Sequence, residues 1–218
     1  FKLTREMDDR RDRMTIEDKQ IITFQQLLNS DERYIQDVII CNEQLDGVLL
    51  ERFSLTNVIF ERCIFVYCYF SKWDLTDVVF KHCDLSNCKL EGGYFYRTSF
   101  INCKLLGTKF STSHFKQCSY DQCFANYVSF GEAQFDQTVF YQCTMNDSDF
   151  YKIYHNQLQF HNCELNAANF EETKLNGLDL SSTYFEELYL DLNKVKGLKI
   201  APQQAPIIAM MFGIKIAE

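Results

Sequence analysis

The sequence predicts an all-β solenoid, because its apolar residues recur at a strict five-residue period. Leu or Phe stands at nearly every fifth position from 45 to 190, with no shift of frame. Of these 30 positions, 15 are Phe and 11 are Leu, and the exceptions are Tyr120, Ala125, Met145 and His155. Apolar residues recur every three or four residues in an amphipathic helix and every two residues in a strand. A longer fixed repeat indicates stacked units that bury their apolar faces against their neighbours.

Small side chains form a second column, two residues before the first. Nine of the ten cysteines stand in this column, and only Cys41 lies outside it. Ser, Thr and Ala fill many of its other positions, as at Thr98, Ser113 and Ala133. Small residues therefore recur in the same five-residue frame as Leu and Phe.

Local units such as Cys83-Asp84-Leu85-Ser86-Asn87 and Ala168-Asn169-Phe170-Glu171-Glu172 carry a resemblance to the pentapeptide-repeat family. The consensus of that family is a small residue, Asp or Asn, Leu or Phe, and two variable polar positions. The resemblance covers about two thirds of the chain. It implies a right-handed quadrilateral β-helix in which four repeats make one square coil, with both columns pointing inward and residues 20 apart stacked. Cys63, Cys83 and Cys103 follow that spacing, as do Phe60, Phe80 and Phe100.

The chain is expected to divide into three parts. Residues 43–190 form the β-helix, and their 30 repeats would make a rod about 36 Å long at the usual strand spacing of about 4.8 Å. Residues 1–42 form a charged segment, a capping helix and a lead-in strand over 33–44. Thr15 would cap that helix, with Ile21, Phe24, Leu27 and Leu28 on one face covering the open first coil. Residues 191–218 form the C-terminal cap.

The C-terminal cap has the signals of a strand and a helix. Leu198–Ile200 looks extended, Pro202 and Pro206 bracket a helix start, and Gly213 ends the helix before an extended segment over 214–216. Its apolar residues exceed what one narrow coil needs; they are Ile207, Ile208, Met210, Met211 and Phe212. Two interpretations stay open here, a simple cap and a homodimer seam. Resemblance supports the seam, because Qnr-type members of the family dimerise tail to tail.

The cysteines and histidines predict neither a metal site nor a cofactor. No cysteine pair has CxxC spacing, and the four histidines do not group with cysteines at ligand spacing. His155 stands at an inward position and is expected to be a satisfied core residue. Free thiols are suitable small core residues, and reduced thiols indicate a cytoplasmic protein. The longest apolar stretch, 205–214, is too short to span a bilayer, which predicts a soluble protein without a membrane partner.

Charge is unevenly distributed along the repeats. Residues 43–115 contain 8 acidic and 8 basic residues, whereas residues 116–190 contain 11 acidic and 3 basic ones. The position of each residue within the 20-residue coil assigns eight of these acids to two neighbouring faces. They are Glu132, Asp147, Asp149, Glu164, Glu171, Glu172, Glu186 and Glu187. Within residues 116–190, Lys152 is the one basic residue on those two faces. An acidic rod has a charge pattern like that of duplex DNA and would repel nucleic acid itself.

Resemblance to the Qnr-type quinolone-resistance proteins implies a function for these faces. That group binds DNA gyrase and topoisomerase IV as DNA mimics and protects them from quinolones. The present chain has no out-of-frame insertion between 45 and 190, whereas several Qnr proteins carry loops that matter for protection. Binding to the enzyme is therefore expected, and drug protection is in doubt.

Other classes of function stay open beside this one. The acidic faces could be plain solvated surface, or a scaffold for an unrelated partner that also uses Tyr127, Tyr151, Tyr184 and Tyr189. An enzyme is not expected, because the chain has no Gly-rich phosphate loop and no nucleophile elbow.

Overall fold

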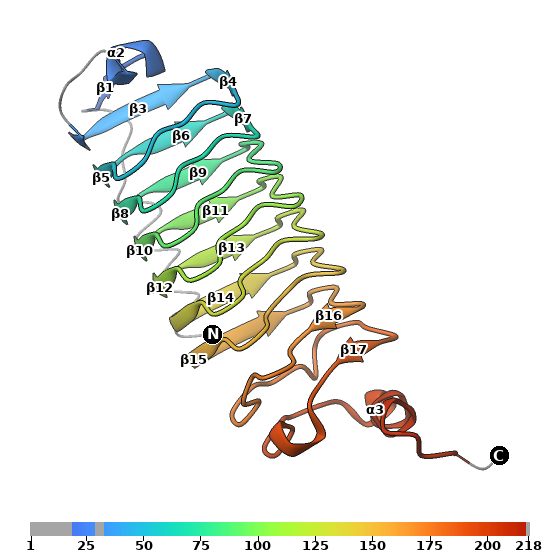
Figure 1. Ribbon diagram of the computed structural model, residues 1–218. Coiled ribbons are helices and arrows are strands. Elements are labelled where there is room, and N and C mark those ends of the chain that lie inside the picture. Colours follow the sequence, from blue (N-terminus) through green and yellow to red (C-terminus); the bar gives the residue numbers. More distant parts are fainter. Residues whose placement is uncertain (1–18, 29–32, 217–218) are drawn as a thin grey trace.

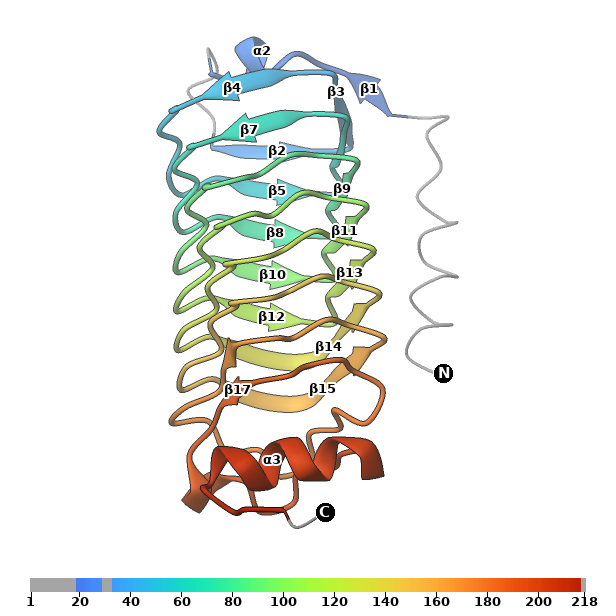
Figure 2. The ribbon, with the colours of Figure 1, turned by 90° about the vertical axis from the view of Figure 1, so that its right-hand side faces the viewer.

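The protein is a four-sided β-solenoid with a helix at each end (Figure 1). The computed structural model describes residues 19–28 and 33–216. Its coils stack along one axis, and helix α3 (Ala205–Met211) lies across the C-terminal end in the view of Figure 2. Strands of successive coils pair in parallel at an offset of 20 residues, for example Phe60 with Phe80 and Phe95 with Phe115. The predicted coil of 20 residues is confirmed.

Each coil has four faces, which we name by the residues at their centres. Face A is centred on residues 40, 60 and so on to 160, and contains β3 (Val38–Cys41), β6 (Ile59–Glu61), β9 (Val79–Lys81), β11 (Ser99–Ile101) and β13 (Ser119–Asp121). Face D is centred on residues 35, 55 and so on to 155, and contains β2 (Tyr34–Gln36), β5 (Ser54–Thr56), β8 (Asp74–Thr76), β10 (Tyr94–Tyr96) and β12 (His114–Lys116). The long strands β14 (Gln134–Tyr141) and β15 (Tyr154–His161) run from face D to face A.

The other two faces are formed by short strands and isolated bridges. Face B is centred on residues 45, 65 and so on to 185, with β4 (Gln44–Asp46) and β7 (Ile64–Val66) at its N-terminal end. Face C is centred on residues 50, 70 and so on to 190, with β16 (Ala168–Asn169) and β17 (Leu188–Tyr189) at its C-terminal end. Between them the coils are joined by bridges such as Asp84–Lys104 on face B and Lys109–Ser129 on face C.

A left-handed residue forms every corner. Each fifth residue from Asp37 to Glu172 has φ between 50° and 64°, although glycine stands at only three of these positions, 47, 92 and 107. The left-handed region costs an L-residue about 1–2 kcal/mol. The corner amide nevertheless keeps a hydrogen bond to the next coil, as from Asn57 N to the Thr76 carbonyl at 2.9 Å. These bonds hold the chain at each right-angle turn.

The inward columns form continuous ladders. On face A, the rings of Phe60, Phe80, Phe100, Tyr120, Phe140 and Phe160 stack in order with centroids 4.5 to 5.1 Å apart. Most positions of the five-residue column are buried, which confirms the predicted frame, and Leu45 and Leu190 at its ends are half-buried.

His155 departs from its column. It is half-buried, and its Nε2 lies 2.7 Å from the Lys174 carbonyl, so the expectation of a core histidine is wrong. No main-chain hydrogen bond joins β15 to residues 174–176 in the described structure. The imidazole therefore bonds to the Lys174 carbonyl in place of a main-chain amide of β15.

The small column is polar as well as small. Nine cysteines are buried, and the thiols of eight of them donate to carbonyls of the preceding coil, as from Cys103 Sγ to the Phe80 oxygen at 3.3 Å, whereas Cys163 bonds to the His161 carbonyl of its own coil. Thr108 and Ser113 make the equivalent bonds to the Leu85 and Leu90 oxygens. A small donor can therefore bond to the preceding coil from this column, although the hydroxyls of Thr98, Thr138 and Ser148 have no hydrogen-bond partner in the described structure.

Tyr120 carries a hydroxyl that has no hydrogen-bond partner in the described part of the chain. It is 1 % exposed and stacks between Phe100 and Phe140. Removing a buried, unpaired polar group avoids its desolvation penalty, so Tyr120→Phe is expected to raise the free energy of unfolding by about 1–2 kcal/mol. Urea denaturation followed by circular dichroism measures this. The reverse change, Phe100→Tyr, is the control and should destabilise; a destabilised Tyr120→Phe would contradict the assignment.

The N-terminal end differs from the sequence prediction. Thr15 lies outside the described residues, and Ile21 belongs to strand β1 (Gln20–Ile21), which pairs with β3 and leaves Ile21 71 % exposed. The helix is shorter, α2 (Phe24–Leu28), and begins at a capping box in which Thr23 and Gln26 exchange hydrogen bonds. Phe24 is fully buried, with its ring centroid 5.5 Å from that of Phe65. Among the described residues, Phe24 and the partly buried Ile22 thus pack onto the core at the first coil.

The coil stacking extends beyond the repeats at both ends. Strand β2 pairs with β5 and β3 with β6, within the segment predicted to lead in. The predicted strand over 198–200 is reduced to a single bridge, between Asp179 and Lys199. Two 3₁₀ turns, η2 (Leu192–Lys194) and η3 (Pro202–Gln204), precede α3. After α3, Gly213 has φ 75° and the Ile214 amide bonds to the Ala209 carbonyl, which ends the helix as predicted.

Candidate functional site

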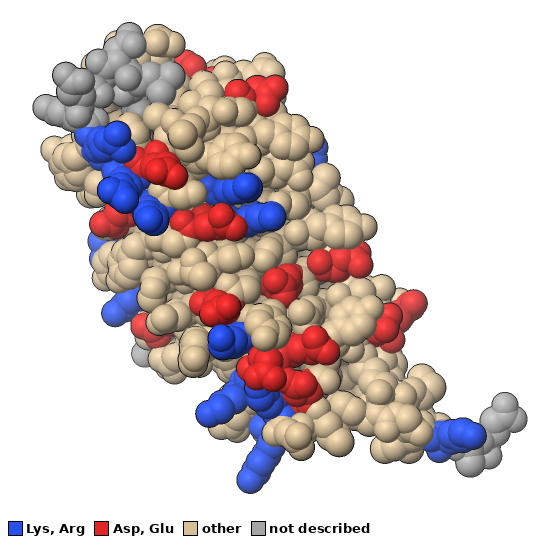
Figure 3. All heavy atoms as spheres, viewed as in Figure 1, with Lys and Arg blue, Asp and Glu red and all other residues tan. Residues whose placement is uncertain are grey.

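The eight predicted acids lie on faces B and C of the C-terminal coils. Seven are exposed and Asp149 is half-buried. Figure 3 shows acidic side chains gathered over the C-terminal part of the rod, with basic side chains among them. We call these eight residues, together with Tyr127, Tyr151, Tyr184 and Tyr189, the acidic face.

Two of the eight carboxylates form ion pairs within the chain, and a third, Asp149, accepts several hydrogen bonds. Glu132 pairs with Lys152 at 3.4 Å, and Glu172 pairs with Lys194. Asp149 accepts hydrogen bonds from the Ser129 hydroxyl, the Tyr151 amide and the Asn169 side chain at 3.1 to 3.2 Å. The sequence did not predict the contribution of Lys194, because it lies beyond the periodic segment that fixes the faces.

The other five carboxylates have no ion pair with any described residue. They are Asp147, Glu164, Glu171, Glu186 and Glu187. Because they are exposed and close to one another, their negative potentials add over this surface. The arrangement suits a basic surface of another molecule.

An asparagine ladder holds part of the acidic face in place. Asn126 Oδ1 accepts from the Asn146 amide at 2.8 Å, and Asn146 Oδ1 accepts from the Asn166 amide at 2.9 Å. Asn166 Oδ1 accepts in turn from the amides of Glu186 and Glu187 at 2.9 and 3.1 Å. Sequence reasoning missed this ladder, although its 20-residue spacing was a readable signal.

Exposed aromatic rings stand among the acids. Tyr127 is 61 % exposed and Tyr184 is 58 % exposed, and Tyr151 and Tyr189 are exposed as well. The Tyr184 hydroxyl donates to Glu186 Oε1 at 2.6 Å, and this hydrogen bond raises the pKa of Tyr184. The acidic face therefore offers both charge and flat apolar surface.

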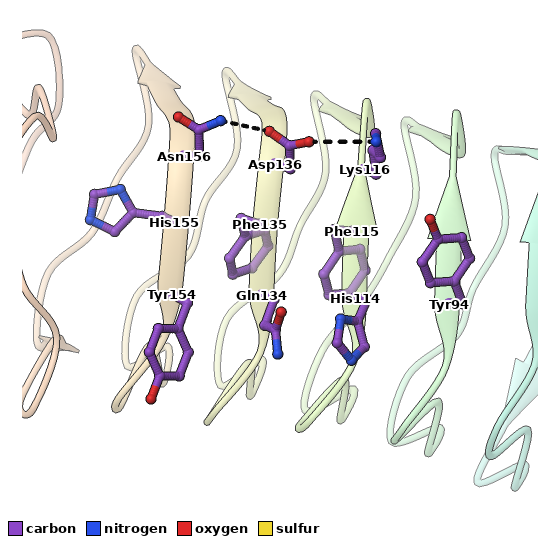
Figure 4. A pocket seen from close by; sticks show the side chains of 10 residues that line it. All are labelled: Tyr94, His114, Phe115, Lys116, Gln134, Phe135, Asp136, Tyr154, His155 and Asn156. Atoms are coloured by element: carbon purple, nitrogen blue, oxygen red, sulfur yellow. Dashed lines mark hydrogen bonds and ion pairs between the residues drawn. The ribbon is translucent and has the colours of Figure 1, made fainter.

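A shallow hollow lies on face D. It has a volume of about 350 Å³ and lies between two rows of outward side chains, one with Tyr94, His114 and Tyr154 and the other with Lys116, Asp136 and Asn156. Figure 4 shows the second row linked, from Asn156 to Asp136 at 2.8 Å and from Asp136 to Lys116 at 3.9 Å. Neither His114 nor His155 bonds to a carboxylate in the described residues. Within the described ranges no three His, Cys, Asp or Glu residues are grouped so that they could hold a metal ion.

The predicted dimer residues fall into two sets. Ile207, Ile208 and Met211 pack against the core of their own chain. Met210 is 58 % exposed and Phe212 is half-buried, and beyond them Ile214 and Ile216 are 58 % and 52 % exposed. The apolar surface that α3 leaves open therefore centres on Met210 and Ile214. Over residues 19–28 and 33–216, no helix combines the length and apolar character needed to cross a bilayer.

Comparisons with known proteins agree with the five-residue period. The family model for the pentapeptide repeat region matches residues 93–170, and that for pentapeptide repeats in eight copies matches residues 159–190. No curated protein matches the chain. A solved structure of QnrB1, a plasmid-mediated fluoroquinolone resistance protein, is 18 % identical, covers 91 % of this chain and 98 % of that one, and has a TM-score of 0.48. HetL from the cyanobacterium Nostoc sp. strain PCC 7120, a pentapeptide-repeat protein involved in heterocyst differentiation regulation, is 10 % identical, with coverages of 82 % and 89 % and a TM-score of 0.37.

The matched repeats over residues 93–190, the square coils and the inward Leu or Phe of most units are those of a pentapeptide-repeat protein.

Proposed function

We propose that the acidic face binds a type II topoisomerase, DNA gyrase or topoisomerase IV, in place of duplex DNA and so modulates the enzyme. The observation that carries the proposal is the density of charge. Glu132 and Glu187 are 55 residues apart in a 20-residue coil, so the eight carboxylates extend over about 13 Å of the rod axis at about 4.8 Å per coil. Counting the two lysine-paired carboxylates as neutral, the net charge over this length is about one per 2.2 Å, against about one per 1.7 Å for B-DNA.

The remaining parts of the proposal follow from this match. A surface that carries charge at nearly the density of a duplex is attracted to a basic, duplex-binding groove and competes with DNA there. The same charge disfavours direct binding of nucleic acid. Type II topoisomerases act in the cytoplasm, where the ten free cysteines would stay reduced, so we place the protein there. Protection from quinolones is a separate step that binding alone does not require.

Inhibition of DNA supercoiling by gyrase tests the proposal. We expect inhibition by the wild type that weakens as salt rises from about 50 to 200 mM, because each phosphate-like contact contributes to the salt dependence. The triple variant Glu164→Lys, Glu171→Lys, Glu186→Lys reverses three unpaired carboxylates and should raise the inhibitory concentration about tenfold or more.

A control matches the change in net charge elsewhere on the rod. Asp46→Lys, Glu51→Lys, Asp74→Lys reverses three exposed acids of the N-terminal coils and should leave inhibition nearly unchanged. If both triple variants inhibit like the wild type, the mimicry proposal is wrong. Binding that persists without competition by duplex would instead favour an interaction scaffold with a different partner. Adding ciprofloxacin to the same assay separates inhibition from protection.

We also propose that the protein is a homodimer joined through α3, which would place the acidic faces of two subunits near the centre of one longer rod. The double variant Met210→Asp, Ile214→Asp changes exposed residues only and is expected to give a folded monomer by light scattering. Ile21→Asp, an exposed apolar residue at the other end, is the control and should stay dimeric. A wild type that is already monomeric at micromolar concentration would refute the dimer.

A further inference from the structure

Tyr184 presents an open ring between two carboxylates on face B. Its side chain is 58 % exposed, and its hydroxyl donates to Glu186 Oε1 at 2.6 Å. Glu164 lies beside it in the preceding coil, since Glu164 and Tyr184 form a parallel bridge. An aromatic face is thus bordered by a carboxylate two residues along the chain and by another one coil away.

The asparagine ladder holds the Glu164 carboxylate and the backbone of Glu186, whose carboxylate bonds to the Tyr184 hydroxyl. Asn146 Nδ2 donates to Glu164 Oε2 at 3.4 Å, and Asn166 Oδ1 accepts from the Glu186 amide at 2.9 Å. The acceptor groups around the ring are therefore oriented before a partner arrives, which lowers the entropy that binding must overcome.

Two tyrosine rings in the N-terminal half of the rod, exposed Tyr69 and half-buried Tyr96, are covered by the chain's own cations. Lys89 Nζ lies 4.6 Å from the ring centroid of Tyr69, and Arg97 Cζ lies 4.0 Å from that of Tyr96. In the described residues no cation lies over Tyr184, and no ion pair engages Glu164 or Glu186. The ring of Tyr184 therefore lacks the cation that Tyr69 and Tyr96 receive from their own chain.

We infer that Tyr184, Glu164 and Glu186 form a binding site for an arginine side chain of the protein partner, an inference that rests on the proposed function only in requiring a basic partner. A guanidinium is planar, stacks flat on an aromatic ring and carries five donors in a fixed fork. It can lie on Tyr184 while donating to both carboxylates. A lysine ammonium gains the charge attraction but neither the stacking nor the fork.

Two labelled peptides test the site directly. One alternates Gly and Arg and the other Gly and Lys at equal length, and fluorescence anisotropy measures the binding of each to the full chain at low and high salt. The Arg peptide is expected to bind about two- to five-fold more tightly, the range for a cation over an exposed ring. Tyr184→Ser should bring the ratio close to one, whereas Tyr184→Phe keeps the ring and should keep most of the preference.

The controls separate stacking from charge. Glu164→Gln with Glu186→Gln should weaken both peptides, and Tyr154→Ser, on the exposed ring of face D, should change neither. Circular dichroism verifies that each variant is folded. An Arg-to-Lys ratio unchanged in Tyr184→Ser, or binding of neither peptide at low salt, overturns the site. A preserved Arg preference in a protein that does not inhibit gyrase overturns the proposed function and leaves the arginine site standing.

Discussion

Raising the pH above 9 is expected to unfold the rod cooperatively, because its buried thiols are neutral in the folded state. Burial raises the pKa of Cys118 to about 12 and raises the pKa values of Cys103, Cys123 and Cys143 as well, from an ordinary value of 9.0. In the unfolded chain these thiols ionise as the pH passes 9. Their contribution to stability is therefore fully present below pH 9 and is lost as the pH rises toward the folded-state pKa values.

The size of the effect is large relative to the stability of a domain. Each such thiol removes about 1.4 kcal/mol per pH unit above 9, so the four together remove about 5–6 kcal/mol per unit. Against a typical free energy of unfolding of about 5–15 kcal/mol, a midpoint between about pH 10 and 11.5 is expected. Circular dichroism across an alkaline titration, with a reductant present, measures it.

Cys118→Ser isolates one thiol. Serine keeps a donor for the Phe95 carbonyl, which Cys118 contacts at 3.2 Å, and Ser113 shows that a hydroxyl is accommodated in this column. The variant should unfold at higher pH, by about 0.3–0.8 unit, with a shallower pH dependence. Cys41→Ser, at the half-buried cysteine, should shift the midpoint less. Unfolding that begins below pH 9, or an unchanged midpoint in Cys118→Ser, would contradict this account.

Phe130→Ala is expected to be the most destabilising single truncation in the middle of the rod. The Phe130 ring stacks on Phe110 and Phe150 with centroids 5.2 and 5.3 Å apart, and it makes edge contacts with rings from faces A and D. Loss of a buried Phe costs about 3–5 kcal/mol, and here the cavity would interrupt a ladder on which the coils at both sides depend. Equilibrium unfolding in urea measures the loss.

The same column supplies the controls. Leu190→Ala truncates a half-buried residue at the end of face C and should cost about 1 kcal/mol, in proportion to its smaller burial. Phe130→Leu should be milder than Phe130→Ala, since Leu90 occupies an equivalent position and is fully buried. If Phe130→Ala costs no more than Leu190→Ala, the stacked core does not contribute as described.

The periodic part of the fold was predictable because one number, the five-residue period, determines which side chains point inward and which coil neighbours meet. Phe80 and Cys83 are buried as that register requires. The ends were less predictable, because outside the repeat the same apolar residues fit either a helix or an added strand. Ile21 satisfied the helical pattern but joined β1, and the capping box at Thr23 was the overlooked signal of where the helix begins.

For the acidic face, the five-residue register predicted which faces carry the carboxylates, but it could not predict which lysines pair with them. Long charged side chains choose partners by distance in space, and Lys194 reaches Glu172 from a segment that has no repeat. Asn166 was within reach of sequence reasoning, since Asn126, Asn146 and Asn166 stand 20 apart, yet its contact with Glu186 depends on a side-chain orientation that spacing alone does not fix.

In a square coil of 20 residues, the position of a surface residue within the coil determines the face from which it points. Inserting one whole coil between two positions would lengthen the rod by about 4.8 Å and leave all outward residues pointing as before. Inserting a single repeat of five would instead rotate everything after it by a quarter turn, carrying Glu164 and Tyr184 from face B to the direction of face C while the N-terminal coils stay still. Duplication of a whole coil can therefore lengthen the rod without turning its surface residues, whereas duplication of one repeat turns the surface residues that follow it.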